Sequence, residues 1–363
     1  MTDRERIWNE FQTLVGFDAE SGEEQEIASY LKEKLRSLGL HVSEDGAGNL
    51  CAVLEGTRPG PGVLFSAHMD TVAPGKGKRA ILSSDGTIRS DGTTVLGADD
   101  AAGITAILEA LTVLREKNLS HPMIEVLFSV EEERYSRGLI SFPYDRLRSP
   151  VAYVLDLTGR IGTAAVAAPS ILSLDITVTG KAAHAGFSPE DGVNALTVAA
   201  RALAGLRTGH VEPDTTVNFG TISGGSGKNI VPDKVCIRGE IRSLRHERAL
   251  AEAEQIRACF LEEAEKLGGQ AEVLVTEELR AYRVPEEAPV VRRFRRALAS
   301  LGYGEGTLIT TFGGSDNNRF LQAGISGIVL ACAMEDVHST AEHSDLGELQ
   351  KSAELTLRLM TLD

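Results

Sequence analysis

The sequence predicts an α/β protein, with a mixed sheet flanked by helices and a smaller α+β domain of ferredoxin-like topology inserted into it. Its 363 residues, 42% of them hydrophobic, exceed what one domain of ordinary size usually holds. Between residues 63 and 156, apolar β-rich runs alternate with a helical pattern, as in βαβ units. Beyond residue 168 the order becomes β-α-β-β-α-β. We therefore expect one domain from residues 1–168 and 280–363, and an inserted domain from residues 169–279.

The first elements along the chain are helical. Residues 26–40, EIASYLKEKLRSLGL, carry apolar side chains at helical spacing. Ser21 and Glu24 precede them in a capping-box pattern, in which each side chain accepts a backbone N–H of the first helical turn. Residues 101–117, AAGITAILEALTVLREK, form a second helical pattern between apolar runs, which predicts a crossover helix between parallel strands.

The inserted domain is expected to contain four strands and two helices. Alternating apolar and polar residues predict the strands, and longer stretches with helical spacing predict the helices. The strands are expected at residues 171–180, 215–223, 235–244 and 271–279, and the helices at residues 191–206 and 246–268. A further helical pattern at residues 288–302 returns the chain to the larger domain.

Charge and hydropathy argue against nucleic acid and membranes as partners. The chain has 52 acidic and 37 basic residues, a net charge of −15, and no Lys/Arg cluster, which disfavours nucleic acid and anionic membranes. The N-terminus, MTDRERIWNE, is charged from its third residue and lacks the apolar stretch of a secretory signal. No later segment offers the roughly 18 consecutive apolar residues of a membrane span. We expect a cytoplasmic protein that acts on small molecules or peptides.

The four cysteines are expected to be reduced thiols that serve in packing. Cys51, Cys236, Cys259 and Cys332 lie far apart, without a CxxC pair. A metal site in this chain would therefore draw on histidine and carboxylates.

Four apolar runs end in groups that bind metals. VLFSAHMD ends in His68 and Asp70, GADD in Asp99 and Asp100, IEVLFSVEEE in three glutamates at 131–133, and AYVLD in Asp156. Open α/β sheets bind ligands beyond the carboxyl ends of their strands, so these segments are expected to meet in one crevice.

Histidine combined with carboxylates favours zinc, or cobalt and manganese, over magnesium. The carboxylates are too many for one tetrahedral ion, so we expect a two-metal site with a bridging carboxylate. The second histidine must come from elsewhere in the chain.

A series of motifs resembles the zinc-dependent exopeptidases and deacylases, a family that includes peptidase T, glutamate carboxypeptidase and succinyl-diaminopimelate desuccinylase. The motifs occur in the family's order over nearly the whole chain: SAHMDTV, LGADDAAG, FSVEEE, VLDLTG, GKAAHAGFSPEDGVNAL, GGSGKNIVPD with RGEIRS, TFGGSDNN and VHSTAEH. DGTTVLGADDAAG is most similar to the peptidase T branch.

The resemblance implies a ligand set. His68 and Asp156 would bind one ion, Glu133 and His338 the other, and Asp99 would bridge the two. It also implies a cis peptide bond between this bridging aspartate and the residue that follows it.

The resemblance assigns roles around the metals as well. Asp70 would accept the second N–H of the metal-binding imidazole, and Glu132 would be the general base. In the inserted domain, His184 would stabilise the oxyanion, while Asn229 and Arg242 would contact substrate.

Some assignments stay open at the level of sequence. Either of the two adjacent aspartates at 99 and 100 would serve as a cap for the following helix. The three consecutive glutamates leave their register open by one residue. His343 competes with His338 as the last ligand. A loop histidine explains His184 without catalysis, and an ion pair explains Arg242 equally well.

These observations together predict a cytoplasmic two-zinc aminopeptidase that acts on short peptides, a tripeptidase of the peptidase T type. The inserted domain is expected to act as a lid with hinges near residues 168 and 279, and it would serve in a possible homodimer. An N-acyl amino acid deacylase or carboxypeptidase is the alternative within the same chemistry. A non-catalytic peptide-binding protein is the alternative of another class.

Overall fold

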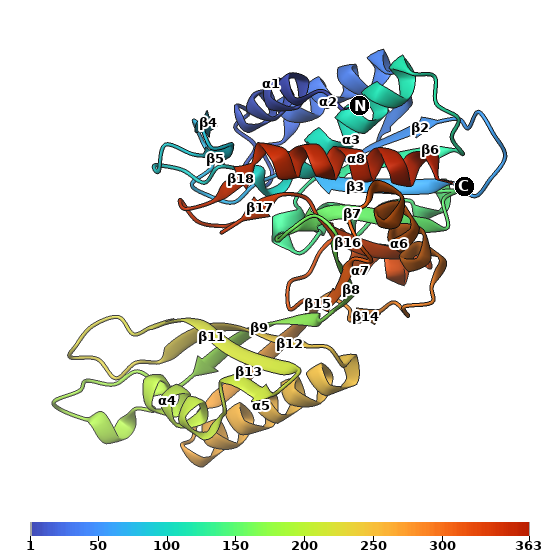
Figure 1. The fold of residues 1–363 in the computed structure, drawn as a ribbon. Coiled ribbons are helices and arrows are strands. Elements are labelled where there is room, and N and C mark those ends of the chain that lie inside the picture. Colours follow the sequence, from blue (N-terminus) through green and yellow to red (C-terminus); the bar gives the residue numbers. More distant parts are fainter. Residues whose placement is uncertain (1, 363) are drawn as a thin grey trace. The chain divides into compact units, whose positions relative to one another are not determined.

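The computed structural model describes residues 2–362, which form two compact units. The larger unit contains residues 2–167, 283–311 and 315–362. The smaller unit contains residues 168–282 and 312–314. Figure 1 labels most of the helices and strands of both units.

The larger unit is built on a nine-stranded mixed sheet. Its order is β1-β2-β6-β3-β7-β16-β8-β14, and β15 also pairs with β8. The strands are β1 (His41–Glu44), β2 (Leu50–Leu54), β3 (Val63–His68), β6 (Ile124–Ser129), β7 (Val151–Leu157), β8 (Thr163–Ala168), β14 (Tyr282–Arg283), β15 (Thr307–Thr310) and β16 (Ser326–Ala331). A four-stranded antiparallel sheet accompanies it, formed by β4 (Ile81–Leu82), β5 (Thr87–Arg89), β17 (Met334–Glu335) and β18 (His343–Asp345).

Helices cover both faces of the large sheet. They are α1 (Arg4–Val15), α2 (Gln25–Ser37), α3 (Ala98–Glu116), α6 (Pro289–Leu301), α7 (Asp316–Gln322) and α8 (Leu346–Thr361). Helices α1, α3 and α8 pack together, as Figure 1 shows. Alternate side chains of a strand point to opposite faces, so in β7 Val154 packs in the cluster that includes Phe320 of α7, while Tyr153 stacks on Phe65.

The central strands β6, β3, β7 and β16 are parallel, which fixes the position of the site. In the register of β3 with its neighbours, His68 pairs with Ser129 of β6, and Ser66 pairs with Val154 of β7. The carboxyl ends of these strands therefore lie at one edge of the sheet. The segment after β6 and the side chain of Asp156 reach that same edge.

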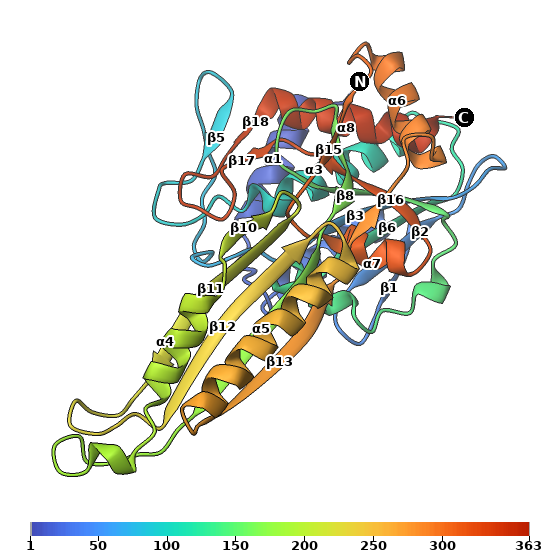
Figure 2. The same ribbon diagram turned by 90° about the horizontal axis from the view of Figure 1, so that it is seen from below.

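The smaller unit has the predicted ferredoxin-like topology. Its elements are β9 (Ser170–Thr179), α4 (Ala195–Gly205), β10 (Gly209–Glu212), β11 (Thr215–Gly224), β12 (Lys234–Ser243), α5 (His246–Lys266) and β13 (Gln270–Leu279). The antiparallel sheet has the order β10-β11-β12-β9-β13, so the short β10 is an addition to the predicted pattern. Both helices lie along one face of this sheet and share a single apolar core with it (Figure 2).

The capping-box prediction is wrong. Helix α2 begins at Gln25, and its N-cap Glu24 makes no side-chain capping hydrogen bond. The hydroxyl of Ser21 donates instead to Asp70 Oδ2 at 2.7 Å. The two side chains of the pattern are engaged in tertiary contacts, which a local sequence pattern does not report.

Within residues 2–362, none of the helices combines the length and apolar character that crossing a membrane requires.

Candidate metal centre

His68 ends β3, and its imidazole is held in one tautomer. The ring Nδ1 lies 2.9 Å from the backbone carbonyl oxygen of Asp70 and 3.4 Å from its carboxylate Oδ1. A carbonyl oxygen only accepts hydrogen bonds, so Nδ1 carries a proton, which leaves Nε2 as the nitrogen that a metal ion would bind. The predicted contact with residue 70 is present, but the main-chain oxygen is the nearer acceptor. The ring is therefore oriented as a metal ligand requires.

Asp99 lies between two histidines. Its Oδ1 is 2.9 Å from His68 Nε2, and its Oδ2 is 3.2 Å from His338 Nε2. One carboxylate thus presents a separate oxygen to each imidazole, which is the arrangement that a bridging ligand needs. Asp99 is 6% exposed.

Asp100 faces a different way from its neighbour. Its Oδ1 accepts the backbone N–H of Gly103 at 3.0 Å, and its Oδ2 accepts that of His68 at 3.2 Å. The first contact lies within α3, just after its kink, and the second ties this helix to β3. The peptide bond between Asp99 and Asp100 is cis, as the resemblance implied. The expectation that this aspartate pair ends a strand is wrong, because both residues lie at a kink with non-helical backbone angles near the start of α3.

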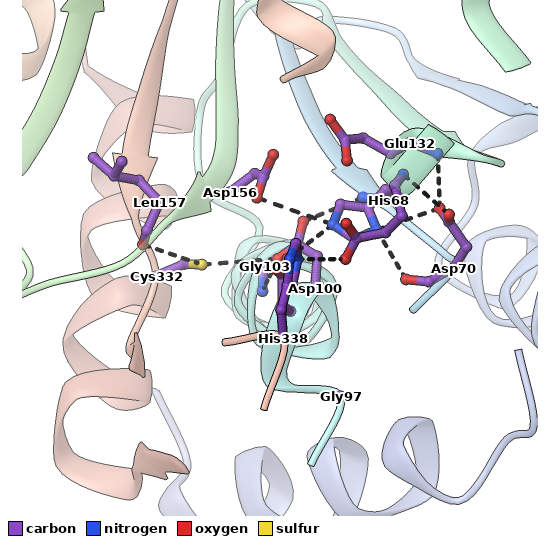
Figure 3. Close-up of polar contacts among 12 residues, drawn as sticks. His68, Asp70, Gly97, Asp100, Gly103, Glu132, Asp156, Leu157, Cys332 and His338 are labelled. Atoms are coloured by element: carbon purple, nitrogen blue, oxygen red, sulfur yellow. Dashed lines mark hydrogen bonds and ion pairs between the residues drawn. The ribbon is translucent and has the colours of Figure 1, made fainter. Parts of the chain in front are cut away.

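The remaining carboxylates form two groups around the His68 ring. Asp99 and Glu133 complete one group, and Glu132 and Asp156 complete the other; in each group the three possible ligand atoms lie within 4.8 Å of one another. Figure 3 shows Asp156 and Glu132 near the imidazole, with Asp70 on its other side. The carboxyl ends of β3 and β7 and the segment that follows β6 thus meet as the sheet order requires.

His338 lies in this cluster, whereas His343 does not take part in it. His338 Nε2 is 2.9 Å from Glu133 Oε1. His343 lies in β18, where its Nδ1 is 3.3 Å from the carbonyl oxygen of Ala341 and 3.5 Å from Asp336. Of the two candidates that the sequence left open, only His338 is brought to the other ligands.

Negative charge is crowded in this site. Burial raises the pKa of Glu132 and of Asp156 well above ordinary values, and nearby carboxylates raise both pKa values further. Contacts with Asp99 and Glu133 raise the pKa of His338 to about 10. Burial alone would lower the pKa of His68, but its carboxylate neighbours outweigh burial and raise that pKa. In the absence of metal, bound protons neutralise the charge of these carboxylates. Divalent cations would neutralise the same charge and displace the protons.

The donor set fits metal ions of the zinc type. Two imidazole nitrogens and several buried carboxylate oxygens converge. The two carboxylate oxygens of Asp99 each lie next to one of the two imidazole rings. Cys332 lies near the site, with its Sγ 3.7 Å from Asp100 Oδ1. Burial raises the pKa of this thiol, so it is protonated and unsuited to metal binding.

The three predicted residues of the inserted domain lie in the smaller unit. His184 is exposed, and its Nδ1 accepts the backbone N–H groups of Gly186 and Phe187, both at 3.1 Å. The neutral ring therefore carries its proton on Nε2, as an oxyanion donor must. The main-chain carbonyl oxygen of Asn229 accepts the N–H of Ala185 at 3.0 Å. This bond brings Asn229 next to His184.

Arg242 on β12 is engaged within its own unit. Its guanidinium donates to Glu240 at 2.8 and 3.1 Å and to the carbonyl oxygen of Phe312 at 2.9 Å. The ion pair that the sequence left as an alternative is therefore formed. Contact with substrate would require this arginine to exchange partners.

Sequence reasoning missed a group of supporting carboxylates. Glu342 accepts the backbone N–H groups of Gly97 and Asp99 at 2.8 and 3.0 Å, next to the bridging carboxylate. Asp316 of α7 accepts the hydroxyl of Ser129 at the end of β6. Both acids lie in motifs that were quoted for the resemblance, TFGGSDNN and VHSTAEH, and their position in those motifs was the available signal.

Comparisons with known proteins agree with this architecture. A model described as "Peptidase dimerisation domain" matches residues 166–267, and one described as "Peptidase family M28" matches residues 49–184. The chain is 37% identical over 368 residues to "Uncharacterized protein YqjE" of Bacillus subtilis, with 99% of each chain covered. It is 33% identical to peptidase T of Escherichia fergusonii over 205 residues, which span 47% of this chain and 50% of that protein.

Solved structures match over the full chain. The aminopeptidase PepT of Bacillus cereus has a TM-score of 0.90 at 38% identity, covering 99% of this chain and 98% of that one. A tripeptidase of Staphylococcus aureus has a TM-score of 0.95 at 34% identity, covering 100% and 99%. The Bacillus subtilis YXEP protein, described as a dinuclear metal-binding peptidase of the M20 family, shares the fold with a TM-score of 0.75 at 18% identity, covering 99% and 98%.

The chain has the fold of a metallopeptidase, and its histidine–carboxylate cluster could hold metal ions. The chain belongs to the peptidase T-like family of metal-dependent exopeptidases. This membership confirms the resemblance and the fold class predicted from the sequence.

Proposed function

We propose that this metal-dependent peptide hydrolase is a two-zinc aminopeptidase for short peptides, a tripeptidase of the peptidase T type. The observation that supports it most is the division of the two Asp99 oxygens between His68 and His338. Asp156 completes the ligands on the His68 side, and Glu133 completes those on the His338 side. The full-length likeness to a PepT aminopeptidase and a tripeptidase supports the substrate class.

The ions, when bound, supply Lewis-acid polarisation of the scissile carbonyl and lower the pKa of water. Glu132 takes the proton of the attacking water and returns it to the leaving amine. Its burial raises its pKa, which suits a group that must both accept and donate a proton near neutral pH. His184, with Nε2–H free to donate, stabilises the oxyanion, and Asn229 and Arg242 hold the substrate.

The inserted domain, residues 169–279, would act as a lid and provide the contact of a homodimer. The match of residues 166–267 to a peptidase dimerisation domain supports this assignment. The domain that carries the metals would then comprise residues 1–168 and 280–363. The cytoplasmic location and the absence of nucleic-acid and membrane partners stay predictions from the sequence.

A panel of di- and tripeptides with free and blocked N-termini tests the proposal, assayed before and after chelation and metal restoration. We expect hydrolysis of tripeptides with a free N-terminus, loss of activity on chelation, and recovery with zinc. Hydrolysis of blocked substrates alone would identify a deacylase or carboxypeptidase instead. Tight binding of peptides without turnover would identify the non-catalytic binding protein.

A further inference from the structure

The segment that carries Glu132 and Glu133 has an unusual backbone. It begins at Val130, just after β6, and continues through a 3₁₀ turn at Glu132–Arg134. Glu131 has φ 51°, Tyr135 φ 62° and Ser136 φ 51°. Non-glycine residues adopt this left-handed region only at a cost, so contacts from elsewhere must hold the segment in place.

Two buried carboxylates receive the backbone N–H groups of the three glutamates. Glu24 Oε1 accepts the N–H of Glu131 at 3.0 Å. Asp70 accepts the N–H of Glu132 at 2.9 Å through Oδ1 and that of Glu133 at 3.2 Å through Oδ2. Three consecutive N–H groups are thus bound by side chains distant in the sequence.

The residues Ser21–Glu24 connect these contacts into one unit. Ser21 Oγ donates to Asp70 Oδ2 at 2.7 Å, which orients the carboxylate that receives Glu133. Glu24 Oε1 also accepts the N–H of Gly22 at 2.8 Å, which folds the Ser21–Glu24 segment on itself. Neither side chain caps α2, and Glu24 is only 4% exposed. Glu24 instead binds the Glu131–Glu133 segment directly, and Ser21 binds it through Asp70.

We propose that Ser21 and Glu24 are positioning residues that hold Glu131–Glu133 in the geometry required for turnover. The inference rests on the proposed function, because it assigns the base and a metal ligand to this segment. Neither residue contacts a reacting atom. Ser21 acts through Asp70, and Glu24 acts on the N–H of Glu131, next to the base.

The test compares Ser21→Ala, Glu24→Ala and Glu24→Gln in the metal-loaded full-length protein. Loss of an outer-shell partner of this kind lowers activity by roughly 10- to 100-fold, and we expect that loss in kcat for Ser21→Ala and Glu24→Ala. KM should change less than twofold. Glu24→Gln keeps an acceptor oxygen and should recover most of the loss. Glu26→Ala, an exposed position in the first turn of the same helix, is the matched control.

Amide hydrogen exchange of residues 130–136 gives a readout independent of activity. The N–H groups of Glu131–Glu133 should exchange faster in Ser21→Ala and Glu24→Ala, with unchanged exchange in β3 and β7. Unchanged exchange in residues 130–136 would overturn the proposal, as would a kcat loss in Glu24→Gln equal to that in Glu24→Ala. If the wild-type protein hydrolyses no peptide, the proposed function fails, and the exchange result still decides whether the two residues hold the segment.

Discussion

Replacement of Glu132 by glutamine separates the base from the metal ligands. The substitution exchanges one carboxylate oxygen for an amide group of similar size. The residue is 8% exposed, and its Oε1 accepts the hydroxyl of Ser136 at 3.4 Å. Because burial and neighbouring carboxylates raise the pKa of Glu132, the metal-free protein already favours its neutral form, and the neutral amide should cost the fold little.

The expected loss is therefore confined to turnover. General acid–base catalysis contributes roughly 10²- to 10⁴-fold, which is about 3–5 kcal/mol of transition-state stabilisation. Two zinc ions per chain should remain by metal analysis, while kcat for a tripeptide falls by that factor. Glu133→Gln should instead lose metal, because Glu133 lies 2.9 Å from His338 in the ligand cluster. We expect metal affinity to fall by at least about 100-fold in that variant.

Glu131→Gln is the control within the same turn. Its side chain forms an exposed ion pair with Arg134 at 2.9 Å, and such pairs contribute about 0–1 kcal/mol. Both metal content and kcat should stay within about twofold of wild type. Metal loss in Glu132→Gln with retention in Glu133→Gln would refute the assignment and shift the register by one residue.

Three further results are expected. The metal-free protein should lose stability as pH rises from 6.5 to about 10. The pKa of His338 is higher in the folded than in the unfolded protein, so its stabilising contribution is complete below the unfolded-state pKa and disappears as pH passes the folded-state pKa. His338→Gln should flatten this part of a profile of melting temperature against pH. Chelation should lower the melting temperature, since metal at 100 times Kd stabilises by about 2.7 kcal/mol per ion, and no shift would contradict a structural contribution from the ions. Glu342→Ala should cost about 2–6 kcal/mol in urea unfolding, because the N–H groups of Gly97 and Asp99 lose their acceptor, while Glu342→Gln should restore part of it.

The sequence predicted the parts of the fold that periodicity and strand ends determine. The alternation in β9, β12 and β13 indicated the ferredoxin-like unit, which the structure contains. The end of β3 placed His68 at the edge of the sheet because the apolar run of the sequence ends there in an imidazole and a carboxylate. Periodicity indicates which side chains of a single helix or strand are buried, so it predicts the features of the fold that depend on one element alone.

Tertiary contacts were beyond that kind of reasoning. The Ser21 and Glu24 pattern has the spacing of a cap, and nothing local shows that Asp70 and Glu131 receive these side chains. The choice between His338 and His343 also needed the structure, because it depends on how the chain turns between β17 and β18. The roles of the site residues stay predictions that the variants above test.

The hydrogen bond from His68 to the main-chain oxygen of residue 70 has a consequence for protein engineering. A peptide oxygen is supplied by every amino acid, so no substitution at this position removes it. Variants at Asp70 would keep the imidazole tautomer and lose the acceptors for Glu132 and Glu133. Substitution of Asp70 therefore separates the two roles of this residue, which are to orient the His68 ring and to bind the N–H groups of Glu132 and Glu133. If the Asp70 side chain were the acceptor for the ring, one substitution would remove both contacts.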